Sequence, residues 1–94
     1  PYLRTKTLFQ QITKSNQGVQ TDCFAIAFRN DSPPGTDTSD ANNSFTVDGV
    51  LVRAGETLEI GQPEGCLDQT QYKIVFLNDA GGTNLCNVIR IVPF

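Results

Sequence analysis

The stretch Phe45–Ile60 reads Phe-Thr-Val-Asp-Gly-Val-Leu-Val-Arg-Ala-Gly-Glu-Thr-Leu-Glu-Ile. Asp48-Gly49 separates two short runs of strand-forming residues, and Asp-Gly supplies the positive φ angles that a two-residue type I′ hairpin turn needs. Ala54-Gly55 predicts a second turn. Glu56–Ile60 then alternates polar and apolar residues, as a half-buried strand does. The stretch therefore predicts three short strands joined by tight turns, which is typical of a small antiparallel β-domain.

Strand patterns also precede this stretch. Pro1–Ile12 is rich in Thr and other β-forming residues, and its polar content predicts an edge strand or a lightly buried one. In Thr21–Arg29, Phe24, Ile26 and Phe28 share one predicted face, whereas Cys and two Ala residues occupy the other. Apolar residues on both faces favour a central strand, and the small side chains favour close approach of another layer.

Two more strands follow the central stretch. Gln71–Leu77 alternates, so every second residue from Tyr72 to Phe76 is predicted to face inward. Asn78–Gly82 has turn chemistry and predicts a hairpin into Asn84–Val92, which is apolar on both faces and ends at a proline. These patterns predict one domain over residues 1–94. We expect an all-β fold, a small antiparallel β-sandwich of about seven short strands that is Ig-like or jelly-roll-like.

The segment 30–44 is predicted to be an exposed loop. It contains Pro33-Pro34-Gly35 and a run of Asp, Ser, Thr and Asn, which cannot bury enough apolar area to order itself. Such a loop is the first place to look for a contact surface. The candidate interface residues are Asp31, Pro33, Pro34, Asp37, Asp40 and Asn42 in this loop, with Tyr2 and Phe94 as apolar anchors at the two ends of the sequence.

Charge and hydropathy bound the choice of partners. The 94 residues include 7 Lys and Arg and 10 Asp and Glu, which gives a net charge of −3 without any basic block. Nucleic-acid binding is therefore not expected. The longest apolar run, Ile74–Leu77, is far shorter than the roughly 20 residues of a membrane-spanning helix. The partners that remain are other proteins, and no small-molecule substrate is expected.

Histidine is absent from the chain, which excludes Ser-His-Asp and Cys-His catalysis and most zinc and copper sites. Asp31, Asp37 and Asp40 offer oxygen ligands for Ca²⁺, but their spacing matches no EF-hand pattern, so solvated loop acids are the preferred interpretation. Glu56 and Glu59 are predicted to lie on opposite faces of one strand and so do not form a catalytic carboxylate pair. We expect a protein that is not an enzyme and binds no metal or cofactor.

The three cysteines have no Cys-x-x-Cys spacing, so the sequence contains no redox or zinc-knuckle motif. Two interpretations are open. All three can be unbonded thiols that pack as small hydrophobic side chains, or one disulfide can form and leave one thiol over. For a disulfide the predicted pair is Cys66–Cys86, because Cys66 lies in a turn that can adapt to the geometry of the bridge.

Asn42-Asn43-Ser44 leads into Val47–Ile60, which fits the pattern V-x-G-V-x-V-x-x-G-E-x-x-x-I, with Ala54 where Pro often precedes the Gly-Glu pair. This segment resembles small β-sandwich structural proteins of bacteriophage virions. The resemblance implies a building block of the virion, such as a capsid-associated, decoration or appendage subunit. Such a subunit assembles with copies of itself or docks on a larger shell protein. Thr-rich edge strands are one place where neighbouring subunits could add a strand.

A second function class is compatible with the same fold. The alternative is an Ig-like adhesion module or a carbohydrate-binding module of an extracellular bacterial protein. Carbohydrate binding usually needs exposed aromatic rings, and the chain has no Trp and only Tyr2 and Tyr72 as tyrosines. The assembly state in solution separates the two classes, because a virion component is expected to form a defined oligomer or to dock on a particle.

Overall fold

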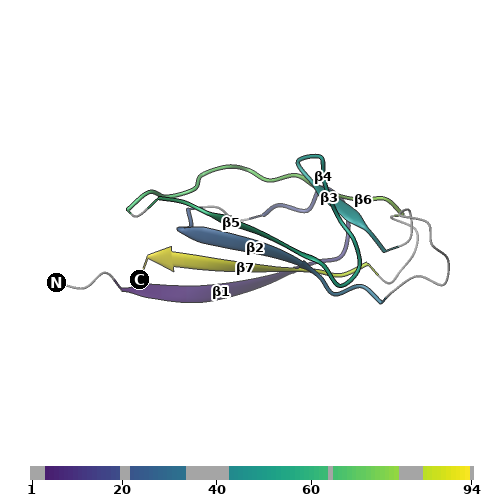
Figure 1. Cartoon of the computed structure of the whole chain (residues 1–94), viewed down its shortest axis with the longest axis horizontal. Coiled ribbons are helices and arrows are strands. Elements are labelled where there is room, and N and C mark those ends of the chain that lie inside the picture. The colour runs from purple at the N-terminus through teal and green to yellow at the C-terminus, as the bar shows by residue number, and fades with distance from the viewer. Residues whose placement is uncertain (1–3, 20–21, 34–42, 64, 79–83, 94) are drawn as a thin grey trace.

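The computed structural model describes residues 4–19, 22–33, 43–63, 65–78 and 84–93, and within these ranges every regular element is a strand. The predicted all-β sandwich is confirmed: two antiparallel sheets face each other (Figure 1). The strands are β1 Thr5–Ile12, β2 Ala25–Asn30, β3 Phe45–Val47, β4 Val50–Val52, β5 Thr57–Gly61, β6 Ile74–Phe76 and β7 Cys86–Pro93.

The strand order is of the jelly-roll type. One sheet has the order β1-β7-β2-β5 and the other β4-β3-β6. An immunoglobulin domain places its first strand beside its second, whereas here the first strand lies beside the last, as in a jelly roll with one of its eight strands missing. The segment Thr13–Val19 runs beside β6 in place of that strand. Asn16 N–H donates to Ile74 O (3.0 Å), and Phe76 N–H donates to Ser15 Oγ (2.8 Å).

The hairpin predicted at the centre of the chain is confirmed. Asp48 and Gly49 connect β3 to β4 with φ angles of 48° and 88°, as a type I′ turn requires. The turn is also tied to the segment before β6, because Asp48 Oδ1 accepts the Lys73 N–H (2.8 Å) and Asp48 N–H donates to Lys73 O (3.0 Å). The second predicted turn contains Gly55 at φ 85° and carries the chain from the three-stranded sheet into the four-stranded one.

The hairpin predicted between Gln71–Leu77 and Asn84–Val92 is wrong. β6 pairs with β3 in one sheet, whereas β7 pairs with β1 and β2 in the other. The connection crosses between the sheets, and residues 79–83 of it lie outside the described residues. Turn chemistry marks where the chain changes direction, but it does not fix which strands pair. A strand that is apolar on both faces is placed best between two neighbours, as β7 is.

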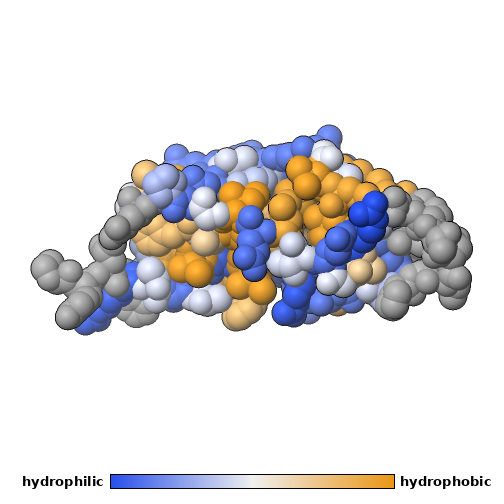
Figure 2. Space-filling view, in the orientation of Figure 1, coloured by the Kyte–Doolittle hydropathy of each residue, from blue (hydrophilic) through white to orange (hydrophobic). Residues whose placement is uncertain are grey.

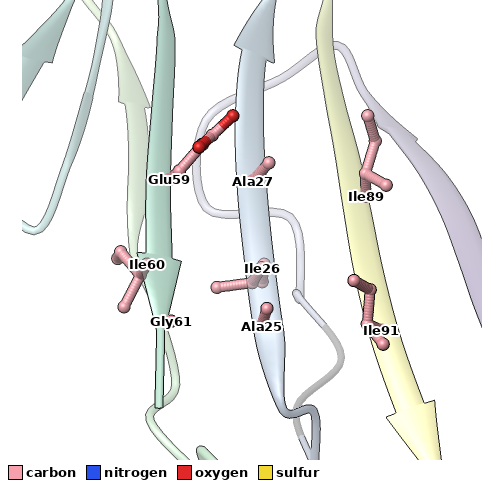
Figure 3. Close-up of a pocket in the computed structure, with 8 residues that line it drawn as sticks. All are labelled: Ala25, Ile26, Ala27, Glu59, Ile60, Gly61, Ile89 and Ile91. Carbon is pink, nitrogen blue, oxygen red and sulfur yellow. The ribbon is translucent and has the colours of Figure 1, made fainter. Parts of the chain in front are cut away.

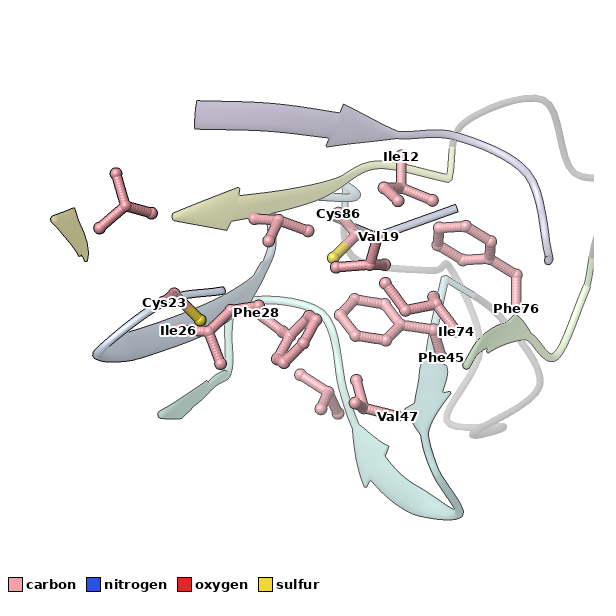
Figure 4. Packing of buried hydrophobic residues seen from close by; sticks show 13 residues of the cluster. Ile12, Val19, Cys23, Ile26, Phe28, Phe45, Val47, Ile74, Phe76 and Cys86 are labelled. Atoms are coloured by element: carbon pink, nitrogen blue, oxygen red, sulfur yellow. The ribbon is translucent and has the colours of Figure 1, made fainter. Parts of the chain in front are cut away.

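The core lies between the two sheets (Figure 4). Phe28 and Val88 face it from the four-stranded sheet, and Phe45, Ile74 and Phe76 face it from the three-stranded sheet. The rings of Phe45 and Phe76 pack edge to face with centroids 5.5 Å apart, a favoured aromatic geometry. Of the inward positions predicted between 72 and 76, residues 74 and 76 are buried, and the tyrosine at 72 is partly buried against the core.

The predicted loop 30–44 is buried where its two ends enter the sandwich, which corrects the expectation of a wholly exposed segment. Asn30 ends β2 and is fully buried; its Nδ2 donates to Asn43 O (2.7 Å) and Val52 O (3.0 Å). Its Oδ1 accepts the N–H of Ser32 (3.0 Å), which is also buried, as is Ser44. Satisfied polar groups of this kind anchor the loop. Residues 34–42 lie outside the described residues.

All three cysteines are free thiols, as the first of the two interpretations predicts, although Cys66 is exposed; the alternative, a Cys66–Cys86 bridge, is wrong. Cys86 is buried beside Asn30 at one end of β2. Exposed Cys66 lies in the segment after β5, which is bonded to Phe24 near the other end of β2. Six residues of extended chain separate these ends, about 20 Å at ~3.4 Å a residue, whereas a disulfide needs Cα atoms within about 7 Å. Burial, followed by the charge of a nearby carboxylate, raises the pKa of Cys86 to about 12.

Candidate interface on the four-stranded sheet

The outer face of the four-stranded sheet is the side that points away from the three-stranded sheet. Alternation along each strand decides which side chains lie on it. In β2, Ile26 and Phe28 are buried in the core, so the residues between and beside them lie on the outer face. The registers then place the outer residues of each strand. They are Thr5, Thr7, Phe9 and Gln11 on β1, Asn87, Ile89 and Ile91 on β7, Ala25, Ala27 and Arg29 on β2, and Thr57, Glu59 and Gly61 on β5.

The middle of this face is an apolar patch, formed by Phe9, Ala25, Ala27, Ile89 and Ile91. Phe9 is 75% exposed and Ile91 is 39% exposed, and the other three are half-buried. An antiparallel sheet that faces water on one side normally carries polar residues there. Figure 2 shows that hydrophobic residues are exposed over both sheets in the view of Figure 1. An exposed apolar patch of this kind is a candidate surface for contact with another molecule.

A shallow depression of about 300 Å³ lies within the patch. Figure 3 shows its three strands side by side, with Ala25 and Ala27 on the middle strand. Ile89 and Ile91 line the depression on the β7 side, and Glu59 and Gly61 on the β5 side. The small alanine side chains keep the floor low between the taller flanks. The depression can therefore receive an apolar side chain from a partner, with Glu59 as a single charged group at its border.

A neutralised charge pair borders the outer face at the end of β2. Arg29 Nε donates to Asp31 Oδ2 (2.8 Å), and Asn87 Nδ2 donates to the same oxygen. The hydrogen bond from Asn87 and then the one from Arg29 hold the pKa of Asp31 below its usual value. The carboxylate stays ionised and paired at neutral pH. A partner that packs on the apolar patch would therefore contact a polar rim here, in which the charges of Arg29 and Asp31 are already paired with each other.

The loop residues predicted as an interface are only partly described. Asp31 adjoins the outer face as described above, and Pro33 is exposed, with its carbonyl accepting a hydrogen bond from Asn43 Nδ2. The other candidates, Pro34, Asp37, Asp40, Asn42, Tyr2 and Phe94, lie outside the described residues.

The apolar patch itself is not among the sites predicted from the sequence. Its signal was present as apolar residues on both faces of the segments that form β2 and β7. For β2 the small side chains on the second face predict close approach of another layer, and for β7 the pattern predicts an inner strand. Among the described residues no layer covers Ala25, Ala27 or Ile91, so the second apolar face is turned outward.

A second, polar depression of about 380 Å³ lies between the segments Asn16–Val19 and Gln71–Lys73. Its amide and hydroxyl groups resemble those that bind sugars, but two of them are engaged within the fold. Gln17 Oε1 accepts the N–H groups of Thr13 (2.8 Å) and Lys14 (3.0 Å). The hydroxyl of Tyr72 donates to a buried carboxylate. This depression is therefore a weaker candidate than the apolar patch.

Within the described ranges, no three or more acidic or cysteine side chains are grouped to hold a metal ion. The described part of the chain also contains no helix of the length and apolarity that crossing a membrane requires.

The outer face has to be interpreted from its own residues. The chain matches no protein-family model, no curated protein sequence and no solved structure.

Proposed function

We propose that the protein is a non-enzymatic structural subunit of a virion, and that it packs against a neighbouring copy or a larger virion protein through the apolar patch. It would serve as a capsid-associated, decoration or appendage subunit. The observation that carries this proposal is the apolar character of the outer face around Phe9, Ala27 and Ile91. A protein that stays monomeric in water rarely exposes a contiguous apolar face, whereas an assembled subunit can bury one in its interface.

The face is large enough to form the centre of an interface, but not a whole one. Four strands about 4.8 Å apart and about six residues long at ~3.4 Å a residue make a surface of roughly 20 Å by 20 Å. This is about half of the roughly 800 Å² that each partner contributes to a standard interface. The apolar patch would supply the dry centre, and polar groups such as Asp31 and Asn87 would supply part of the rim.

The fold and the sequence resemblance favour the same class. Jelly-roll sandwiches recur in viral capsid proteins and in lectins, although a fold by itself does not imply a function. The resemblance of Asn42–Ile60 to virion proteins favours the first of these two. In the structure its last sixteen residues, Phe45–Ile60, form the β3–β4 hairpin and most of β5, so the resembling segment spans both sheets.

The alternative is an adhesion or carbohydrate-binding module of an extracellular bacterial protein. The polar depression beside Tyr72 is the observation that favours it. We place it second because the hydroxyl of Tyr72 and the amide oxygen of Gln17 already have partners within the chain. A glycan array with the purified protein tests this alternative directly.

The proposal is tested on virions of the virus whose genome encodes the chain, purified from a lysate by density gradient. Quantitative mass spectrometry should find the protein at many copies per particle. Ala27→Arg places a charged side chain in the depression and Ile91→Arg places one at its flank, so either variant should lower the copy number at least about tenfold. Val50→Arg is the matched control, because Val50 is 51% exposed on the three-stranded sheet.

The variants are first compared by circular dichroism and thermal unfolding, so that a loss of fold is not mistaken for a loss of docking. Absence of the protein from the particle fraction would overturn the virion role. Full incorporation of folded Ala27→Arg and Ile91→Arg would overturn the assignment of the apolar patch as the docking surface.

A further inference from the structure

The outer edge of β1 is a long and regular strand edge. β1 is the terminal strand of its sheet, and its eight residues pair with β7 without interruption, from Thr5–Pro93 to Ile12–Cys86. Figure 1 shows β1 at the border of the sheet, and no described strand lies beyond it. An uninterrupted edge of this kind is a template for a further strand.

The hydrogen bonds of β2 show which backbone groups of β1 point to the open edge. Asn30 N–H donates to Glu56 O (2.9 Å) and Gln62 N–H donates to Phe24 O (3.1 Å). Even-numbered residues of β2 therefore bond to β5, and odd-numbered ones bond to β7, since antiparallel ladders alternate. Odd-numbered residues of β2 lie opposite odd-numbered residues of β7, so these residues of β7 bond to β2 and its even-numbered residues bond to β1. Even-numbered residues of β7 lie opposite even-numbered residues of β1, so the even-numbered residues of β1 bond to β7.

Four residues of β1 therefore direct both N–H and C=O to the open edge: Thr5, Thr7, Phe9 and Gln11. Beyond them the edge closes, because the Thr13 N–H donates to Gln17 Oε1 (2.8 Å). The open run from residue 5 to residue 11 is centred on Leu8. A second strand that satisfies the whole run must have its own hydrogen-bonding groups at the same spacing of two residues.

We propose that two copies of the chain pair β1 with β1, antiparallel, about a two-fold axis beside Leu8. Thr5 then lies opposite Gln11 of the other copy, and Thr7 lies opposite Phe9 of the other copy. Every open N–H and C=O of the run is satisfied, because each of the four resulting pairs exchanges two hydrogen bonds. This inference concerns the edge of the sheet and does not depend on the proposed function, which concerns its face.

The side chains of β1 suit contact with a second copy. Lys6 is the one charged residue of the strand, and the register places it opposite the amide of Gln10. Arg4 falls opposite Ile12, so no like charges from β1 and its flank face each other. The contact is isologous, which is the commonest symmetry of protein dimers. The two four-stranded sheets become one continuous sheet, and the two apolar patches lie side by side on it.

Sedimentation equilibrium of the full chain, supported by light scattering, tests the proposal. The wild-type chain should form a dimer of twice 10.3 kDa. Thr7→Pro removes an N–H that points to the open edge, so it spares the ladder with β7 but removes two bonds per dimer. It should raise the dimer dissociation constant at least about tenfold. Thr57→Pro is the matched control on the opposite edge, because Thr57 of β5 also points its N–H outward, and it should leave the dimer unchanged.

A cross-linking experiment tests the register, and it also serves if Thr7→Pro fails to fold. In a Cys66→Ser background, Leu8→Cys places two thiols across the axis with Cα atoms about 4.5 Å apart, within disulfide range. Oxidation should cross-link this variant to itself. Thr5→Cys or Gln11→Cys alone should not cross-link, whereas an equimolar mixture of the two should.

The outcomes separate this inference from the proposed function. A wild-type chain that stays monomeric up to millimolar concentration overturns the β1 dimer, as does a dimer that Leu8→Cys cannot cross-link. A dimer that Ile91→Arg dissociates and Thr7→Pro leaves intact shows face-to-face packing instead and also overturns it. None of these results concerns the presence of the protein in particles, on which the proposed function is judged.

Discussion

Asp68 is a buried carboxylate that holds the segment between β5 and β6 against the end of the sandwich. Its Oδ2 accepts hydrogen bonds from Gln62 Nε2 (3.1 Å) and from the Tyr72 hydroxyl, and its Oδ1 accepts the Thr70 N–H (2.8 Å). Its own N–H donates to Cys23 O (2.7 Å). Every acceptor oxygen of the side chain thus has a donor, as a buried charge requires.

These contacts shift two pKa values. Burial raises the pKa of Asp68, but the hydrogen bonds from Tyr72, Thr70 and Gln62 outweigh it and hold the pKa below its usual value. Burial and the bond to Asp68 raise the pKa of Tyr72 to about 12. A folded-state pKa below the unfolded value of about 3.9 means that the ionised group stabilises the fold above that pH. This stability is lost as the pH falls through the folded-state pKa of Asp68.

The Asp68→Asn variant should therefore be less stable at pH 7 by about 1–3 kcal/mol, because an amide N–H₂ replaces one acceptor oxygen and meets donors. Its free energy of unfolding should also fall less steeply than that of the wild type between about pH 4 and pH 2. Urea unfolding at a series of pH values measures both effects. Exposed Glu59→Gln is the control, and an acid dependence of Asp68→Asn as steep as that of the wild type would contradict the assignment.

At the scale of elements, the β3–β4 hairpin depends on the backbone of its turn. Gly49 has φ 88°, a conformation that costs an L-residue roughly 1–2 kcal/mol. A Cβ at this position meets no atom within 4 Å, so any cost of Gly49→Ala is conformational and not steric. The variant should lose about 1 kcal/mol in urea unfolding. Gly18→Ala is the control, because it has equal space without a positive φ, and equal losses in the two variants would contradict this account.

The sequence predicted elements better than their pairing. The turn at Asp48-Gly49 and the strands around it follow from neighbouring residues, so they could be read directly. The partner of β6 could not, because pairing with β3 or with β7 depends on contacts between distant segments. The alternation predicted for Thr21–Arg29 also failed at its start. Cys23 was placed on the face of the alanines but is buried in the core, because regular pairing of β2 begins only at Ala25.

At the scale of the whole molecule, the candidate interface is assembled from parts that are far apart in the chain. Phe9, Ala27 and Ile91 become neighbours only through the strand order β1-β7-β2. The two-faced apolar pattern of β2 and β7 was visible in the sequence, but a sequence cannot say whether the second face is covered by its own chain or by another. Only the topology shows that, among the described residues, the second face is uncovered.

Phe9 gives the sharpest test of this uncovered face, because it is a large aromatic residue at 75% exposure. Phe9→Ser should change the free energy of unfolding of the monomer by no more than about 0.5 kcal/mol, as expected for an exposed site. It should also raise the ammonium sulfate concentration at which the protein precipitates, because sulfate strengthens the association of apolar surface. Fully buried Phe28→Ser is the contrasting variant and should lose about 3–5 kcal/mol.

The two readouts separate the ways in which this view could fail. A Phe9→Ser variant that is as unstable as Phe28→Ser would mean that Phe9 packs within its own chain. A variant with wild-type stability and an unchanged precipitation point would mean that the apolar patch does not drive association. Wild-type stability with raised solubility is the result expected of a side chain held ready for a neighbour, since such a residue adds little to the fold that displays it.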